Sequence, residues 1–164
     1  MNEQETCGAE EKTDKSVLAE EIIRKRVYAA VGAGLVPVPI FDLIALSGIQ
    51  IEMVAKLARL YETPFRKDVA KTAVTALAGS VLPLAAAFPL SSFLKALPVI
   101  GTTTGAVSMS ATGGAATFAV GKVFVRHFES GGTLLSFDPK KAEAYYREKF
   151  KEGKERGDSA EAKF

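Results

Sequence analysis

Two polar side chains lie inside a long apolar segment and are the residues best placed to do chemistry. Asp42 is the only charged residue between Val27 and Ile51, and Gln50 follows it by about two turns of helix. A carboxylate in apolar surroundings needs a cation, a hydrogen-bond donor or a proton, because its hydration is lost. Two interpretations of Asp42 stay open. It is either a helix cap or buried structural residue, or a functional site for a proton or ligand, with Gln50 as a candidate polar counterpart.

Other residues that could carry catalysis or hold a cofactor are few. The chain has one cysteine, Cys7, and one histidine, His127, so an internal disulfide and a His-rich or thiolate metal site are excluded. The segment from Gly32 to Pro37 begins like a dinucleotide-binding loop, but proline stands in place of the third glycine. Residues 101–106 lack the lysine of a phosphate-binding loop. We therefore predict no enzymatic activity, no catalytic residue, no metal and no cofactor.

The composition is apolar, and its charge is close to balanced. Hydrophobic residues make up 48% of the 164 residues and the mean hydropathy is +0.13, while charged residues still reach 24%. The net charge of +2 is too small for the dense basic face of a nucleic-acid-binding protein, so we expect no nucleic-acid partner. Because the N-terminus is acidic, whereas a secretory signal starts basic, we also expect no cleaved signal.

The spacing of apolar residues predicts an all-α fold, a helical bundle. Apolar side chains recur at helical intervals, and no segment shows the alternation of a half-buried strand. A chain of this length fits a single helical domain, which we place at residues 16–152, between flexible polar tails at 1–15 and 153–164. The predicted helix boundaries are Asp14 or Ser16 for the first start, Thr63-Pro64 and Asp138-Pro139 for later starts, and Gly153 for the last stop.

Two apolar regions are predicted to form helical hairpins. The first breaks at Pro37 and Pro39, which leaves two arms, each about half the length that crosses a bilayer. It is either a re-entrant hairpin in one leaflet or a pair of short core helices. The second joins residues 72–94 and 96–121, which are free of charge and long enough to span a bilayer but rich in glycine, alanine and threonine. Small residues let helices approach closely, and the predicted packing positions are Gly101, Gly105, Gly113 and Gly121.

Basic residues flank the apolar blocks, and only Lys95 lies between the two segments of the second region. By the positive-inside rule, this pattern places the basic flanks and both termini on the cytoplasmic side of a membrane. The alternative is a soluble helical bundle whose charges form its solvated face. The basic residues predicted to face lipid are Arg24, Lys25, Arg26, Arg66, Lys67, Lys122 and Arg126.

A pattern of packing and turn residues runs along the chain. It consists of the apolar helix that leads to Pro37-Val38-Pro39, then Asp42, the segment from Gln50 to Tyr61 and the turn from Leu97 to Gly101. On these features the chain, from about residue 17 to 151, resembles the domain of unknown function family 697, the YcjF-like, GTPase-associated domain of bacteria. The shared features are packing and turn residues, so they say little about chemistry. The resemblance implies a place at the bacterial inner membrane. It also implies, at most, a small GTPase partner on a separate chain, because members often follow or are linked to such a domain.

Three functional hypotheses fit these features. The leading one is a membrane-embedded helical adaptor that forms homo-oligomers through its small-residue helices and presents basic helices to anionic lipid and a cytoplasmic partner. The second is an amphitropic bundle, toxin-like or pore-forming, that stays soluble until residues 72–121 insert. The third is a small-solute or proton carrier built around Asp42.

Overall fold

The computed structural model describes the backbone of residues 3–33, 39–86 and 102–161, and side chains within 11–33, 45–80 and 110–157. These ranges contain no strand, so the predicted all-α fold is confirmed. The elements are α1 (Glu3–Ala33), α2 (Pro39–Leu60), α3 (Lys67–Ala86), α5 (Thr102–Glu129), the 3-10 helix η1 (Leu134–Ser136) and α6 (Pro139–Glu161).

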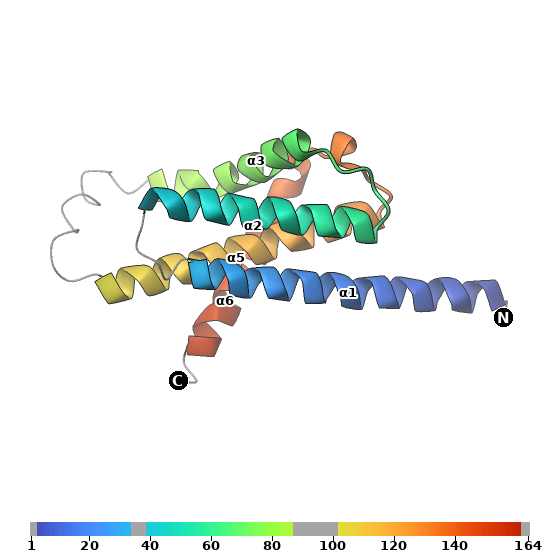
Figure 1. The fold of residues 1–164 in the computed structure, drawn as a ribbon, viewed down its shortest axis with the longest axis horizontal. Coiled ribbons are helices and arrows are strands. Elements are labelled where there is room, and N and C mark those ends of the chain that lie inside the picture. The colour runs from blue at the N-terminus through green and yellow to red at the C-terminus, as the bar shows by residue number, and fades with distance from the viewer. Residues whose placement is uncertain (1–2, 34–38, 87–101, 162–164) are drawn as a thin grey trace.

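Helix α5 is the centre of the bundle and contacts α1, α2, α3 and α6. Helices α1 and α2 lie side by side in opposite directions, α3 returns along α2, and α6 packs against α5 and α3 (Figure 1). The break predicted at Pro37 and Pro39 falls between α1 and α2, with Pro39 as the first residue of α2 and Pro37 outside the described residues. The predicted second hairpin corresponds to α3 and α5, on either side of residues 87–101.

Helix α1 begins well before the predicted caps. It starts at Glu3 instead of at Asp14 or Ser16, and its N-terminal half extends beyond the rest of the bundle (Figure 1). Lys15 supports this extension, because its ammonium lies 2.8 Å from the Glu11 carboxylate one turn earlier and 3.5 Å from Glu62 at the end of α2. The predicted start was wrong because the polar residues before Asp14 continue the helix, along which the pair of Lys15 with Glu11 lies. The division into a domain at 16–152 and two flexible tails stays a prediction.

The turn after α2 differs from the prediction at Thr63. Glu62 adopts a left-handed conformation with φ of 54°, and the Thr63 amide donates to the Ala58 carbonyl at 2.7 Å. The Glu62 amide donates to Arg59, which completes the Schellman motif of a helix end. Thr63 therefore closes α2 and does not cap α3, which starts at Lys67.

The turn between α5 and α6 uses the same motif with glycine. Gly131 has φ of 79°, and the Gly132 amide donates to the His127 carbonyl at 2.9 Å. A Cβ at Gly132 would lie only 2.4 Å from the His127 ring, whose Nε2 is 2.8 Å from the Thr133 carbonyl oxygen. The turn is thus tightly packed on His127. Asp138 then caps α6 as predicted, because its carboxylate accepts the Lys140 amide at 3.0 Å.

The core lies where α5 meets the other helices. Phe124 is fully buried and stacks on Phe137 at a centroid distance of 4.8 Å, and Phe128 packs beside it. Leu57 of α2, Leu77 of α3 and Tyr146 of α6 enclose the cluster. Burial raises the pKa of the Tyr146 hydroxyl to about 12.

Gly153 marks the closest approach of α6 to α5 rather than the end of α6. The helix continues to Glu161, which corrects the predicted stop. A Cβ built on Gly153 would lie 2.9 Å from Ala115 Cα and 3.2 Å from the Ala115 carbonyl oxygen. Because both atoms belong to the backbone, neither can move aside without shifting a helix. Gly157, one turn later, has room for a Cβ, whose nearest atom would be Ala111 Cβ at 3.9 Å.

This difference predicts opposite effects for the same substitution one turn apart. We expect Gly157→Ala to raise the free energy of unfolding by about 0.5–1 kcal/mol, because alanine favours helix over glycine. Gly153→Ala should lower the free energy of unfolding by about 1–2 kcal/mol, because overpacking outweighs that gain. Urea unfolding of both variants checks this, and stabilisation by both would contradict the close approach.

The raised pKa of Tyr146 predicts a loss of stability at alkaline pH. A tyrosine whose pKa is higher in the folded state stabilises the fold fully below its unfolded pKa of about 10 and loses that contribution as pH rises towards the folded value. For Tyr146, whose folded pKa is about 12, the decline falls between about pH 10 and 12. Tyr146→Phe should decline less over that range in thermal unfolding. An identical decline in both proteins would show that Tyr146 does not contribute.

Candidate functional site

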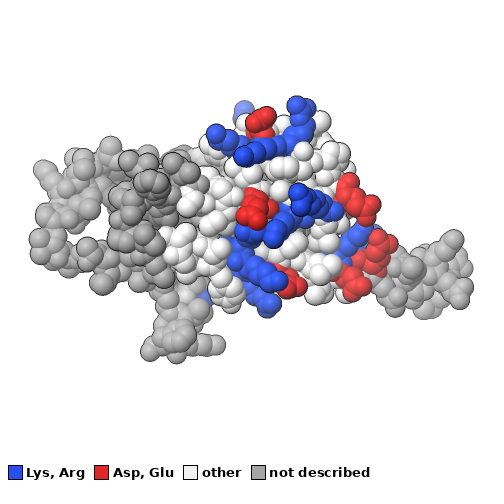
Figure 2. All heavy atoms as spheres, viewed as in Figure 1, with Lys and Arg blue, Asp and Glu red and all other residues white. Residues whose placement is uncertain are grey.

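The segments that carry almost no charge meet at one end of the bundle. Helices α1 and α3 end there, and α2 and α5 begin there (Figure 1). The converging segments are residues 27–33, 39–51, 72–86 and 102–121, and Asp42 is their one charged residue. We call this the low-charge end. On the face shown in Figure 2, most of the basic and acidic side chains of the described residues lie over the middle and the opposite part of the bundle.

Several predicted site residues at the low-charge end lie beyond what the structure describes. Asp42 falls near the start of α2, but its side chain is outside the described set, so its role as cap or functional site stays a prediction. Gly101 is outside it, as are the surroundings of Gly105 in α5. The predicted spans at 72–94 and 96–121 also run into the undescribed residues 87–101. In the described ranges, no helix has both the length and the apolar character that crossing a bilayer requires.

Gln50 joins α2 to α5 in the interior. Its side chain is only 4% exposed, and Nε2 donates to the Thr117 hydroxyl at 3.4 Å. Thr117 in turn donates to the Gly113 carbonyl at 2.9 Å. Gln50 therefore has a partner on α5, and this bond favours the structural interpretation of the residue.

Ser110 makes a second polar link near the low-charge end. Its hydroxyl donates to the Val31 carbonyl at 2.7 Å, across from α5 to the last turn of α1. The final carbonyls of a helix have no partner within the helix. Ser110 supplies that partner and fixes where α1 ends against α5.

Two of the predicted lipid-facing cations hold helices together. Arg26 forms a two-pronged ion pair with Glu52 of α2, with one N–O distance of 2.9 Å, and its side chain is only 17% exposed. Lys122 of α5 pairs with Glu20 of α1. These pairs give Arg26 and Lys122 a structural role. The predicted lipid contact of the basic set as a whole stays a prediction.

The remaining members of the basic set are more open to solvent. Lys25 pairs with Glu21 one turn earlier at 2.7 Å, and the Arg126 guanidinium lies 4.4 Å from the centre of the Tyr145 ring. Arg24, Arg66 and Lys67 are exposed, and no carboxylate of the described residues lies within ion-pair distance of them. These three are the freest cations of the predicted set.

Glycines of α5 do bring helices together, although not all at the predicted positions. A Cβ on Gly121 would meet Ile23 of α1 at 2.6 Å, so this predicted packing position is in close contact. At Gly113 the nearest neighbour, Leu46, would be at an ordinary 3.6 Å. Gly114, which the four-residue spacing missed, would meet Val31 at 2.7 Å. The contacts made by Gly114 and Gly121 are within the chain.

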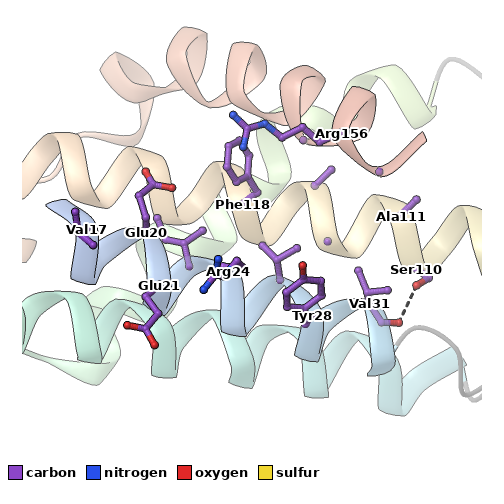
Figure 3. Close-up of a pocket in the computed structure, with 16 residues that line it drawn as sticks. Val17, Glu20, Glu21, Arg24, Tyr28, Val31, Ser110, Ala111, Phe118 and Arg156 are labelled. Carbon is purple, nitrogen blue, oxygen red and sulfur yellow. Dashed lines mark hydrogen bonds between the residues drawn. The ribbon is translucent and has the colours of Figure 1, made fainter. Parts of the chain in front are cut away.

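A groove runs along the bundle between α1, α5 and α6 (Figure 3). Its volume is about 700 Å³. Val27 and Val31 of α1 and Ala115 and Phe118 of α5 form an apolar lining. Arg24 stands on the α1 side, while Arg156 of α6 lies over Phe118, with its guanidinium 4.9 Å from the ring centre.

Sequence reasoning did not find this groove, but it left two signals. Val17 and Tyr28, two large apolar residues of α1, line the groove and are 61% and 70% exposed. Gly114, Gly153 and Gly157 remove side chains from the facing helices. The groove results because α1 contributes large side chains, whereas these glycines leave space on α5 and α6.

The sequence of the chain is similar to a protein family and to a named membrane protein. Residues 9–152 match the model of a protein family described as Domain of unknown function (DUF697). The chain is 38% identical over 141 residues to Magnetosome membrane protein 22 of Magnetospirillum gryphiswaldense, which covers 85% of this chain and 72% of that protein. No solved structure matches the chain.

The link from Ser110 to α1 predicts a measurable loss of stability on its removal. Ser110→Ala should lower the free energy of unfolding by about 1–2 kcal/mol, because the Val31 carbonyl loses its donor in a partly buried setting. Thr72→Ala is the matched control, since that exposed hydroxyl donates to the Asp68 carbonyl within α3 and its loss should change stability by less than about 0.5 kcal/mol. Equal effects in chemical unfolding would contradict the bridging role of Ser110.

Proposed function

Because the chain belongs to the family of domains of unknown function 697, and its matched relative is named a membrane protein, we propose that it is a membrane-associated accessory domain. The low-charge end of the bundle is the part that enters the membrane. The observation that carries this proposal is the convergence of four nearly uncharged segments, far apart in the sequence, at one end of the fold.

The distribution of charge supports this orientation. A charged side chain at the bilayer centre costs about 2.5–3.5 kcal/mol, so a bundle should enter lipid by the end that carries the fewest charges. Insertion of the low-charge end leaves the ion pairs of Arg26 with Glu52 and of Lys122 with Glu20 closer to water. Asp42 is the exception, and its place near the start of α2 allows the helix dipole to stabilise its negative charge.

We further propose that the domain acts without catalysis, as an adaptor. His127, the only histidine, lies in the last turn of α5, where its ring is held against Gly132 and next to the Thr133 carbonyl of the turn that follows. The nearest described hydroxyl, that of Ser136 at 3.5 Å from Nε2, donates to the Thr133 carbonyl at 3.0 Å and belongs to the capping box of η1. This placement supports a structural role for the residue type that most often serves as a general base.

The adaptor would hold its charged half away from the membrane, for a protein partner. We propose the cytoplasmic face of the bacterial inner membrane as its place and a small GTPase as the partner class, both on the family resemblance. Helix α1 supports such an arrangement, because its N-terminal half extends beyond the bundle on the side opposite the low-charge end (Figure 1). A homo-oligomer would have to use surfaces other than Gly114 and Gly121, which pack within the chain.

New charges at the low-charge end should weaken membrane binding. Ala45 and Ala78 are exposed helical residues there, so Ala45→Glu with Ala78→Glu adds two carboxylates without disturbing the core. We expect at least about a tenfold loss of co-sedimentation with vesicles of phosphatidylcholine and phosphatidylglycerol, because about 1.4 kcal/mol corresponds to tenfold. Ala144→Glu, at an exposed position on α6, is the control and should bind like the wild type.

Three outcomes would count against the proposal. Undiminished vesicle binding by the Ala45→Glu, Ala78→Glu protein would show that the low-charge end does not contact lipid. Extraction of the wild-type protein from cell membranes by alkaline carbonate would show that attachment is peripheral rather than inserted. Release of a trapped dye from the same vesicles would favour the pore-forming alternative, since an adaptor leaves the bilayer sealed.

A further inference from the structure

We propose that the groove between α1, α5 and α6 binds one molecule of an anionic, acyl-chain lipid. The lipid phosphate would lie against Arg24 and Arg156, and its acyl chain would follow the apolar lining towards the low-charge end. This inference rests on the proposed function for the direction of the lipid and names the lipid class that the domain recognises.

The size of the groove favours a slender occupant over a protein helix. Its lining runs along α1 from Val17 to Val31, about 21 Å at roughly 1.5 Å of rise per residue. A helix about 10 Å across would fill 700 Å³ in under two turns, which is too short for a stable docking contact. The volume instead falls within the range of about 300–1,000 Å³ that is typical of small-molecule sites.

The charges of the lining favour an anionic headgroup. Glu20 and Glu21 also line the groove, but they pair with Lys122 and Lys25, respectively. Arg156 pairs with Glu152 at one side and turns towards Phe118 over the groove. Arg24 is exposed and has no ion pair with the described residues. The pKa of Glu21 is lowered first by its hydrogen bond to Lys25 and also by the charge of Arg24, but the Arg24 guanidinium makes no hydrogen bond there and can bind a phosphate.

The middle of the groove fits the headgroup of a lipid, and the half beyond it fits the acyl chain. Arg24 lies about halfway along the α1 side, where the charged part of the bundle begins. Beyond it, Val31, Ala111 and Gly157 carry the apolar lining to the low-charge end, which is the part proposed to enter the membrane. A lipid held in this way would keep its phosphate at the level of the headgroups and its chain pointing into the bilayer.

A soluble, single-chain lipid tests binding apart from membrane attachment. The probe is lysophosphatidylglycerol below its micelle-forming concentration, with lysophosphatidylcholine as the neutral counterpart and glycerol 3-phosphate as the headgroup without a chain. Titration calorimetry on the full chain should show binding of lysophosphatidylglycerol at least about fivefold tighter than that of lysophosphatidylcholine, because the choline cation of the latter offsets its phosphate charge and is repelled by the two arginines. Glycerol 3-phosphate should not bind measurably.

Two variants locate the site. Arg24→Gln should weaken lysophosphatidylglycerol binding by at least about fivefold and lysophosphatidylcholine binding by less, whereas Arg59→Gln, at an exposed arginine on α2, should change neither. Gly157→Leu should abolish binding of both lipids, because its side chain would extend into the groove from a position with room for a Cβ. Circular dichroism and thermal unfolding show whether each variant keeps the fold.

The outcomes separate this inference from the proposed function. The Ala45→Glu, Ala78→Glu protein should still bind lysophosphatidylglycerol even where it no longer binds vesicles, so a failure of membrane attachment leaves lipid recognition measurable. Equal binding of the two lysolipids, or undiminished binding by Gly157→Leu, would overturn the groove as an anionic lipid site. So would light scattering that shows a wild-type dimer and a Gly157→Leu monomer, since a second copy would then occupy the groove.

Discussion

The close approach of α5 to its neighbours is the constraint on which the rest of the bundle depends. Gly114 and Gly121 admit the valine and isoleucine side chains of α1, and Ala115 lies against the backbone of α6 at Gly153. Side chains of ordinary size at these positions would force the helices apart, because a packed interior leaves little free volume. Since α5 contacts the other four long helices, its small residues set the spacing of the whole assembly.

Polar interactions fix the rotation and register that this small-residue packing leaves open. Glycine and alanine have almost no protruding side chain, so they allow close contact without specifying which residues meet. Ion pairs from α1 to Glu52 and to Lys122, and the buried bond from Gln50 to Thr117, each match one position on one helix with one on another. The two kinds of contact are complementary, one giving proximity and the other alignment.

Uncharged residues and small residues produce the two features on which the functional proposals rest. Uncharged segments of four helices form the low-charge end, which is the part proposed to enter the membrane. Glycines of α5 and α6 leave a groove beside α1. The groove leads from exposed Arg24 to the low-charge end, so the two features are continuous. A protein with larger residues at Gly114, Gly153 and Gly157 would lose the groove even if its helices were otherwise unchanged.

The sequence by itself determined the helical class, the break near Pro37 and Pro39 and the cap of α6 at Asp138, because these depend on neighbours within about one turn. It also determined the family, through packing and turn residues spread along most of the chain. Only the tertiary structure decided that Gly114 and Gly153 are the close contacts, that Gln50 bonds to Thr117, and that Arg26 and Lys122 pair between helices. The physical reason is that partners on different helices depend on how far each helix is rotated and slid against the next. Small residues spaced four apart predict that a helix can be approached, but the side chains that approach it belong to distant parts of the chain.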